Sequence, residues 1–184
     1  MRNASAAARA LAAILAACLA AAGLPGCRTG LPESVAALGY VNARERFAMN
    51  VPPGWEVREQ GGRPQVFVLG PAGPGGVRPN VNVVVEPAGA AASQAQWEAD
   101  NRAGLEALQG FRLVSETPRD LADGRQVRVL AFRHRVLQRE VIQRQMGILA
   151  GGTVYVVTAT GDPDTFAADE PNFEICLLSF RAAW

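Results

Sequence analysis

The sequence offers few side chains suited to catalysis, and its single histidine is the first to weigh. His134 alternates with Phe132 and Val136, so its side chain points to a partly buried, apolar face of a strand. This pattern favours a hydrogen-bonded structural histidine; a general base near neutral pH is the alternative that the imidazole pKa allows. The chain has no lysine and no Gly-x-Ser-x-Gly segment, which excludes Schiff-base lysine catalysis and an esterase nucleophile elbow. We therefore expect a protein that is not an enzyme.

Four carboxylates crowd one short segment near the C-terminus: Asp162, Asp164, Asp169 and Glu170. Carboxylates at the start of a helix accept hydrogen bonds from free backbone N–H groups and complement the helix dipole. A calcium site is the alternative chemistry, but the segment lacks the spacing and the glycine of an EF-hand loop. We assign no metal ligand here and expect no cofactor.

Arginines form the largest concentration of one charge, between residues 125 and 144. A solvated, salt-bridged surface is one interpretation, and a patch for anionic lipid headgroups or an acidic partner is the other. Alternation places Arg133 and Arg135 on one face of a strand and Arg128 on the opposite face. The residues that we assign to a candidate partner surface are Arg125, Arg133, Arg135, Arg139 and Arg144.

The overall charge argues against nucleic acid as the partner. The chain carries 18 basic and 17 acidic residues, and without its first 26 residues, which include two arginines, the balance is 16 against 17. Nucleic-acid-binding proteins usually show a clear basic excess. The Gly/Pro-rich segment 70–79 is expected to be a surface loop and is a second candidate contact surface.

Residues 1–26 have the pattern of a secretory signal peptide. A short basic start precedes an uncharged run rich in Ala and Leu, residues 10–24, which is too short to span a bilayer comfortably. The segment Leu-Pro-Gly-Cys that ends at Cys27 resembles a bacterial lipobox, although proline is not the usual residue there, and it indicates Cys27 as the lipidation site. Cys18 is the second choice, and ordinary cleavage after Ala22 is the third.

The choice among these sites decides the chemistry of the remaining thiols. If Cys27 is lipidated, Cys176 is the only thiol of the mature chain and no internal disulfide can form. Ordinary cleavage would leave Cys27 and Cys176 able to pair in an oxidising compartment. We expect residues 27–44 to be the lipidated N-terminus and tether, and residues 45–184 to be one folded domain. Because Arg28 is not the aspartate of an enteric retention signal, the outer membrane is favoured if the cell has one.

Period-two alternation of apolar residues predicts most of the fold as strands. The expected strands are 47–51, 55–57, 65–69, 80–86, 111–117, 126–136, 141–149 and 153–160. Pro118 is expected to close its strand, and Asp123-Gly124 predicts a hairpin turn. Connections of hairpin length make the sheet mainly antiparallel.

Two helices interrupt the strands. Ser93 and Gln96 have the spacing of a capping box, and Gly110 is expected to follow the end of that helix. Asp162 and the proline after it predict the start of the last helix, which we expect to restart at Pro171 after a kink. Strands, helix, strands and helix in this order predict the α+β class.

Three segments together resemble the PsbP-like superfamily. Residues 47–55 (Phe-Ala-Met-Asn-Val-Pro-Pro-Gly-Trp) are similar to its opening hairpin, residues 154–160 to its last strand, and residues 171–181 to its closing helix. The similarity covers roughly residues 45–181, and DcrB-type bacterial envelope lipoproteins are the branch that the chain resembles most. The resemblance implies a single-domain α/β/α sandwich, with a twisted antiparallel sheet flanked by helices. It also implies a binding or assembly module.

Taken together, these observations predict an exported, membrane-anchored lipoprotein of the cell envelope that faces the periplasm. We expect it to bind an envelope protein as a non-enzymatic assembly or accessory factor. The alternative is a carrier or sensor module that holds a small lipid or hydrophobic ligand between sheet and helix.

Overall fold

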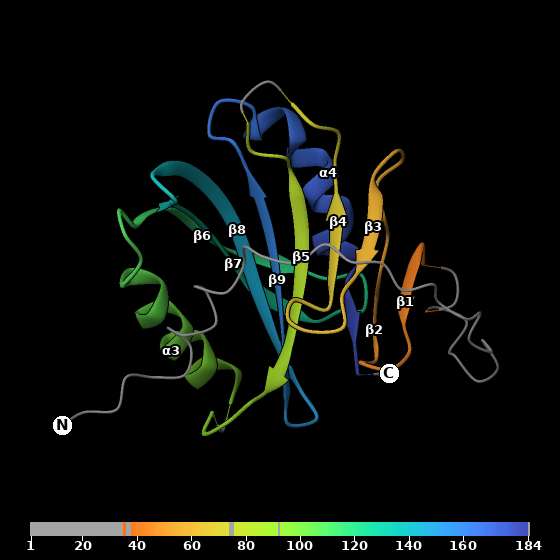
Figure 1. The fold of residues 1–184 in the computed structure, drawn as a ribbon. Helices are drawn as coiled ribbons and strands as arrows, with labels where there is room; N and C mark the ends of the chain where they lie inside the picture. Colours follow the sequence, from red (N-terminus) through yellow and green to blue (C-terminus); the bar gives the residue numbers. More distant parts are fainter. Residues whose placement is uncertain (1–34, 36–37, 74–75, 92, 184) are drawn as a thin grey trace.

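Hairpins build a seven-stranded sheet at the centre of the molecule. The computed structural model describes Val35 and residues 38–73, 76–91 and 93–183. The strands lie in the order β3-β4-β5-β9-β8-β7-β6, and every neighbouring pair is antiparallel (Figure 1). Their bounds are β3 Glu56–Glu59, β4 Val66–Leu69, β5 Asn80–Pro87, β6 Arg112–Asp120, β7 Gln126–Val136, β8 Arg139–Ala150 and β9 Thr153–Gly161. The predicted strands are confirmed to within a few residues at each end.

A smaller sheet joins the two ends of the described chain. It consists of β1 Tyr40–Asn42, β2 Phe47–Met49 and β10 Arg181–Ala182, in the order β1-β2-β10. The sequence did not reveal β1 or β10, because strands of two or three residues are too short to show a period. β1 lies within the segment that we expect to be the tether.

The two helices lie on opposite faces of the large sheet. α3 spans Gln94–Glu106 and α4 spans Phe166–Ser179. Successive residues of β8 show the two sides: the Trp97 indole of α3 lies against Gly147, whereas Arg144 reaches the carboxylates of α4. In Figure 1, α3 lies beside β7 and β8, and α4 lies behind β4 and β5. The α/β/α arrangement and the α+β class are therefore confirmed.

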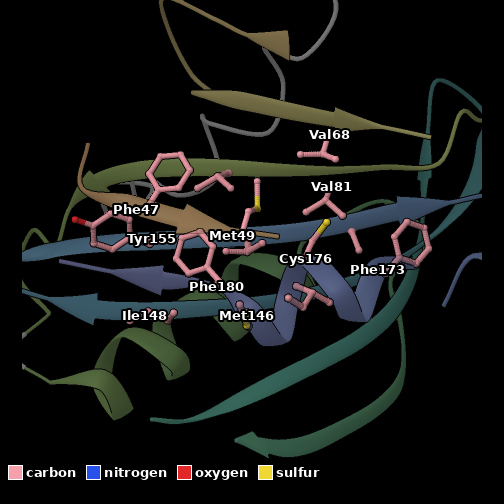
Figure 2. Close-up of a cluster of buried hydrophobic side chains, with 14 of the residues drawn as sticks. Phe47, Met49, Val68, Val81, Met146, Ile148, Tyr155, Phe173, Cys176 and Phe180 are labelled. Atoms are coloured by element: carbon pink, nitrogen blue, oxygen red, sulfur yellow. The ribbon is translucent and has the colours of Figure 1, made fainter. Parts of the chain in front are cut away.

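The main hydrophobic core fills the space between the sheet and α4. Figure 2 shows its side chains, which come from both sheets and from α4. The Phe47 and Phe180 rings stack with their centroids 5.6 Å apart, and Phe173 meets Trp55 edge to face at 5.7 Å. A smaller cluster of Leu105, Leu130 and Phe132 lies under α3. The core therefore joins the short N-terminal and C-terminal strands to the central sheet.

The start of α3 confirms the predicted cap. Ser93 is the N-cap residue, and its Oγ accepts a hydrogen bond from the Gln96 N–H at 3.2 Å. The reciprocal half of a capping box is absent, because the Gln96 side chain donates to Asp100 instead. The helix ends before the predicted Gly110, which adopts a positive φ of 70° in the following turn.

The last helix differs from the prediction at its start and at its proline. Thr165 is the N-cap residue, and Asp162 lies one turn earlier, where its Oδ1 accepts from the Asp164 N–H at 3.0 Å. Pro171 lies inside α4 and does not restart it. A proline inside a helix removes one backbone hydrogen bond. The helix continues because Phe166 and Phe173, on either side of the proline, pack on each other with their centroids 4.9 Å apart and are buried.

Pro118 does not close its strand, because β6 continues to Asp120. β6 is an edge strand that pairs only with β7, and a proline is tolerated there because one side of the strand needs no ladder N–H. Neither helix in the described part of the chain is long and apolar enough to cross a membrane.

Candidate functional site

An exposed, strained turn joins β7 to β8. Leu137 and Gln138 form this turn with φ values of 47° and 67°. Two-residue turns of this kind favour glycine and asparagine, because other side chains are strained at positive φ. The Leu137 side chain is nevertheless 72% exposed. We call Arg133, Arg135, Val136, Leu137 and Arg139 the hairpin end.

Positive charge exceeds negative charge at the hairpin end. Glu140 accepts from Arg133 Nη1 at 2.9 Å and from Arg112 Nη2 at 2.5 Å, so two guanidinium groups share one carboxylate. The hydrogen bond from Arg133, with the charge of Arg112, holds the pKa of Glu140 below its usual value. One positive charge of this trio remains uncompensated.

Arg135 and Arg139 add two more cations. Within the described ranges, neither has a carboxylate at salt-bridge distance. The Arg135 stem lies beside Gly110, and the Arg139 guanidinium lies so close to Gly76 that a Cβ there would overlap its Nη1. Gly76 belongs to the Gly/Pro-rich loop, so the two candidate contact surfaces from the sequence meet at Arg139.

The other two arginines of the predicted surface have structural partners. Arg125 bonds Asp123 with its Nε at 2.8 Å and the Ala182 carbonyl with its Nη2 at 3.1 Å. Arg144 pairs with Glu170 and lies 3.6 Å from Glu174, both in α4. The five arginines therefore do not form one surface: three lie in the hairpin, one in the β6–β7 turn and one between sheet and helix.

His134 has the environment of a structural histidine, as the sequence predicts. It is 3% exposed, its Nε2 lies 3.1 Å from Gln143 Oε1, and its ring packs 5.7 Å from that of Phe132. Burial lowers the pKa of His134, and the hydrogen bond with Gln143 opposes this effect only in part. The side chain that contacts its Nε2 is an amide, which cannot act as a nucleophile.

The Cys176 thiol and the acidic segment at residues 162–170 also have structural rather than reactive environments. Cys176 is fully buried in α4, and burial raises the pKa of its thiol to about 12. Cys27 and Cys18, the candidate lipidation sites, lie outside the described residues, as does the signal peptide. Glu170 pairs with Arg144, and no group of three or more His, Cys, Asp or Glu side chains in the described part could hold a metal ion.

Uncharged polar side chains line up across three strands on the α3 face of the sheet, and the sequence alone did not predict this arrangement. Gln143 and Gln145 of β8, Thr158 and Thr160 of β9, and Asn80 and Asn82 of β5 lie side by side. Their spacing of two residues in each strand was visible in the sequence. It could be recognised as one surface only once the strand order placed β5, β9 and β8 together.

The enclosed space under α3 is small, and a more open hollow of about 310 Å³ lies beside Glu98, against β6 and β7. The enclosed space is a crevice of about 40 Å³, lined in part by Trp97, Asn101, Leu130 and Gln145. One water molecule occupies about 30 Å³ of liquid, whereas pockets for drug-sized ligands run from about 300 Å³ upward.

No protein-family model matches this sequence, and no curated protein matches it. Solved structures do match. The chain is similar to LpqN of Mycobacterium tuberculosis, which is involved in cell envelope biogenesis, with 18% identity, a TM-score of 0.58, and 75% of this chain and 83% of that chain covered. It is similar to cyanobacterial PsbP from Synechocystis, with 15% identity, a TM-score of 0.53, and 78% and 91% covered. It is also similar to a Pseudomonas aeruginosa protein of unknown function, with 19% identity, a TM-score of 0.53, and 67% and 83% covered.

These similarities establish the fold. The mainly antiparallel sheet with its two helices is a PsbP-like fold, as the sequence resemblance implies. At identities below 20%, they do not transfer a ligand or a partner to this chain.

Proposed function

We propose that this protein is an exported lipoprotein, anchored through Cys27, that binds a protein partner of the cell envelope as a non-enzymatic assembly or accessory factor. The observation that carries the proposal is the hairpin end, where an exposed leucine in a strained turn lies between Arg135 and Arg139. Strained backbone persists where function or surrounding structure requires it. The part that LpqN takes in envelope biogenesis supports the same compartment.

The chemistry of the hairpin end favours a partner with an apolar recess and an acidic rim. Burial of one leucine side chain is worth about 1.5–3 kcal/mol, which is weak binding for a free protein. Arginines at a rim mainly steer association and select the partner's charge. A membrane anchor raises the effective concentration of a partner in the same membrane, so a small surface of this kind is sufficient.

We place the folded domain on the periplasmic side, with the outer membrane favoured because Arg28 follows Cys27. The lipid-carrier alternative has no support from the crevice under α3, whose 40 Å³ is far too small for an acyl chain. The space under α4 is filled by the main core.

The test is photo-crosslinking in living cells with a photoreactive amino acid at position 137. The matched control carries it at Gln60, which is exposed in the β3–β4 turn, away from the hairpin end. We expect one envelope protein to be crosslinked from position 137 and not from position 60, and the adduct to be lost in Cys27→Ser. The proposal fails if correctly anchored protein gives no adduct from position 137, or gives the same adducts from both positions.

A further inference from the structure

The strands β7 and β8 separate where their ladder ends. β7 pairs with β8 from Val136 back to Leu130, whose partner is Gln145. Beyond this pair β8 continues beside β9, whereas Gln126–Val129 of β7 continue beside β6 alone. The hollow of about 310 Å³ lies along this part of β7. It is lined by Glu98, Pro118, Gln126, Val127 and Arg128. We call Gln126–Val129 the internal edge of the sheet.

The register of β6 and β7 shows which backbone groups face the side that β8 has left. At the start of the hairpin, the Leu121 N–H donates to the Arg125 carbonyl at 2.8 Å. Backbone groups of successive residues alternate in direction along an antiparallel strand, so those of Gln126 and Arg128 point away from β6. Pro118 lies opposite Arg128 and agrees with this alternation, because a proline has no N–H to exchange.

The side chain of Gln94 in α3 takes the place of β7 in the ladder of β8. If the ladder continued, Arg128 would bond Gly147, and Gln126 would then bond Leu149. Gln94 instead donates to the Gly147 carbonyl and accepts from the Leu149 N–H, both at 2.8 Å. The β7 groups receive no such substitute. In the part of the chain that the structure describes, no hydrogen bond outside the sheet ladders reaches the backbone of Gln126 or Arg128.

The internal edge lacks the protection that the outer edge of β6 has. Proteins protect free strand edges, because unpaired N–H and C=O groups can pair with another chain. β6 carries Pro118 and an irregular register between Leu113 and Ser115, and both disturb pairing on its outer side. Gln126–Val129 have neither a proline nor a shift in register. An unprotected edge beside a hollow suits an extended peptide, which binds an edge through its main chain.

Carboxylates outnumber guanidinium groups around the hollow. Arg128 bonds Glu116 at 2.8 Å and lies 3.6 Å from Glu98. Arg102 also bonds Glu116, at 3.2 Å, but it is shared with a second glutamate of α3. Asp120 accepts from the side-chain amide of its neighbour in β7 and, among the described residues, has no cation at salt-bridge distance. The excess of negative charge favours a basic side chain in the peptide.

We propose that the internal edge binds an extended segment of a partner protein that carries a basic residue. The segment accepts from the Arg128 N–H and donates to the Gln126 carbonyl, and its basic side chain lies against Glu98 and Asp120. The hollow has the volume of a small-ligand pocket, which is enough for a few residues. This surface lies at the opposite end of β7 from the hairpin end, which favours an acidic partner, so it goes beyond the proposed function.

The test measures binding of blocked synthetic pentapeptides to the full-length protein in detergent by NMR. The basic probe is acetyl-Ala-Val-Arg-Val-Ala-amide, and its acidic analogue has glutamate in place of arginine. A third probe is the basic peptide N-methylated at all five residues, which keeps the side chains but loses the backbone donors. We expect the basic peptide to shift the backbone amide signals of Gln126 and Arg128. The other two probes should bind about tenfold more weakly, the effect of roughly one lost hydrogen bond or charge contact.

Matched variants assign the binding to the internal edge. Arg128→Pro removes the N–H that faces the hollow, and Arg128→Ala is the control, because it removes the same side chain and keeps the N–H. We expect the Kd of the basic peptide to be about tenfold higher in Arg128→Pro than in Arg128→Ala. Glu98→Gln with Asp120→Asn should raise the Kd severalfold with less risk to folding. Thermal unfolding confirms that each variant is folded.

Three results overturn the proposal. The first is that the basic peptide leaves the Gln126 and Arg128 signals unshifted. The second is that the acidic or the N-methylated peptide binds as tightly as the basic one. The third is that the Kd is unchanged in the variants that fold.

Discussion

The Trp97 indole of α3 packs against Gly147 in β8. A Cβ on Gly147 would lie 2.7 Å from Cζ2 of Trp97 and closer still to Cζ3 and Cη2. On either side of this contact, the Gln94 side chain donates to the Gly147 carbonyl and accepts from the Leu149 N–H, both at 2.8 Å. β7 pairs with β8 only as far as Gln145, so α3 satisfies the backbone of β8 beyond that point.

Gly147→Ala is therefore expected to destabilise the protein. The added methyl group must displace a large, buried indole, and overpacking of this kind costs about 1–3 kcal/mol. Gly61→Ala is the matched control, because nothing lies within 4 Å of a Cβ there and its backbone is not left-handed. Urea unfolding gives both free energies of unfolding. Equal stability of the two variants would show that α3 does not hold Trp97 against the sheet.

The sequence was sufficient to predict strands in which apolar and polar residues alternate over many positions. It was not sufficient where the local structure depends on tertiary packing. The alternation of Val81, Val83 and Val85 gave β5 nearly to the residue, because one face of that strand is buried. Local rules failed at Pro118 and Pro171. The first is tolerated at a sheet edge, and the second is compensated by the buried rings on either side of it.

The candidate sites show the same limit. The sequence predicted one partner surface from five arginines. The strand pairing and the hydrogen bonds show that three of them lie in the β7–β8 hairpin, whereas Arg125 and Arg144 lie elsewhere. Leu137 carried no signal in the sequence, because its exposure depends on a turn formed without glycine. The alignment of Asn, Thr and Gln side chains across the sheet required the order of β5, β9 and β8, which residue spacing cannot supply.

His134 is expected to titrate below its usual pKa of 6.5. Burial disfavours the charged imidazole in the folded state, so this group stabilises the fold above pH 6.5, and the stabilisation is lost as pH falls toward its folded pKa. It is the only histidine, so its NMR ring signals can be followed without assignment ambiguity. The free energy of unfolding is measured against pH for the wild type and for His134→Gln. The difference between the two curves removes the contribution of the carboxylates, which both proteins share. Titration at or above 6.5 would contradict the buried environment.

The Cys176 thiol should be unreactive in the folded protein, and its burial should lower the stability of the fold at high pH. Burial raises its pKa from 9.0 to about 12, so the folded state keeps the proton that the unfolded state loses. Its contribution to stability is complete below pH 9 and falls by up to about 1.4 kcal/mol per pH unit above it. We expect no alkylation of the Cys176 peptide by iodoacetamide at pH 7.5 until urea unfolds the protein.

The pH at which stability begins to fall distinguishes the Cys176 thiol from the buried tyrosines. Burial also raises the pKa of Tyr40 and Tyr155, but their ordinary value is 10.0, so they contribute at higher pH. Comparison with Cys176→Ala between pH 9 and pH 10 therefore isolates the thiol. A slope that the substitution leaves unchanged would show that Cys176 does not titrate in this way.

Arg144 of β8 is expected to hold α4 against the sheet through an ion pair as well as through packing. Its side chain is 19% exposed, it pairs with Glu170, and its guanidinium lies 5.9 Å from the centre of the Phe166 ring. Partial burial of Arg144 reduces screening by solvent, but Glu170 is more exposed. We therefore expect a coupling free energy of about 0.5–1 kcal/mol between the two side chains. A double-mutant cycle of Arg144→Met and Glu170→Gln measures it, because methionine retains the apolar stem.

The pair of Arg44 and Glu45 provides the comparison. Its Nε and Oε1 atoms lie 3.5 Å apart, but the Arg44 side chain is 89% exposed, so the same cycle there should give a coupling near zero. If the Arg144 coupling is also near zero, apolar contacts such as those of Phe166 and Phe173 hold α4 alone. If it persists in high salt, the partly buried position of Arg144 is what protects the ion pair from screening.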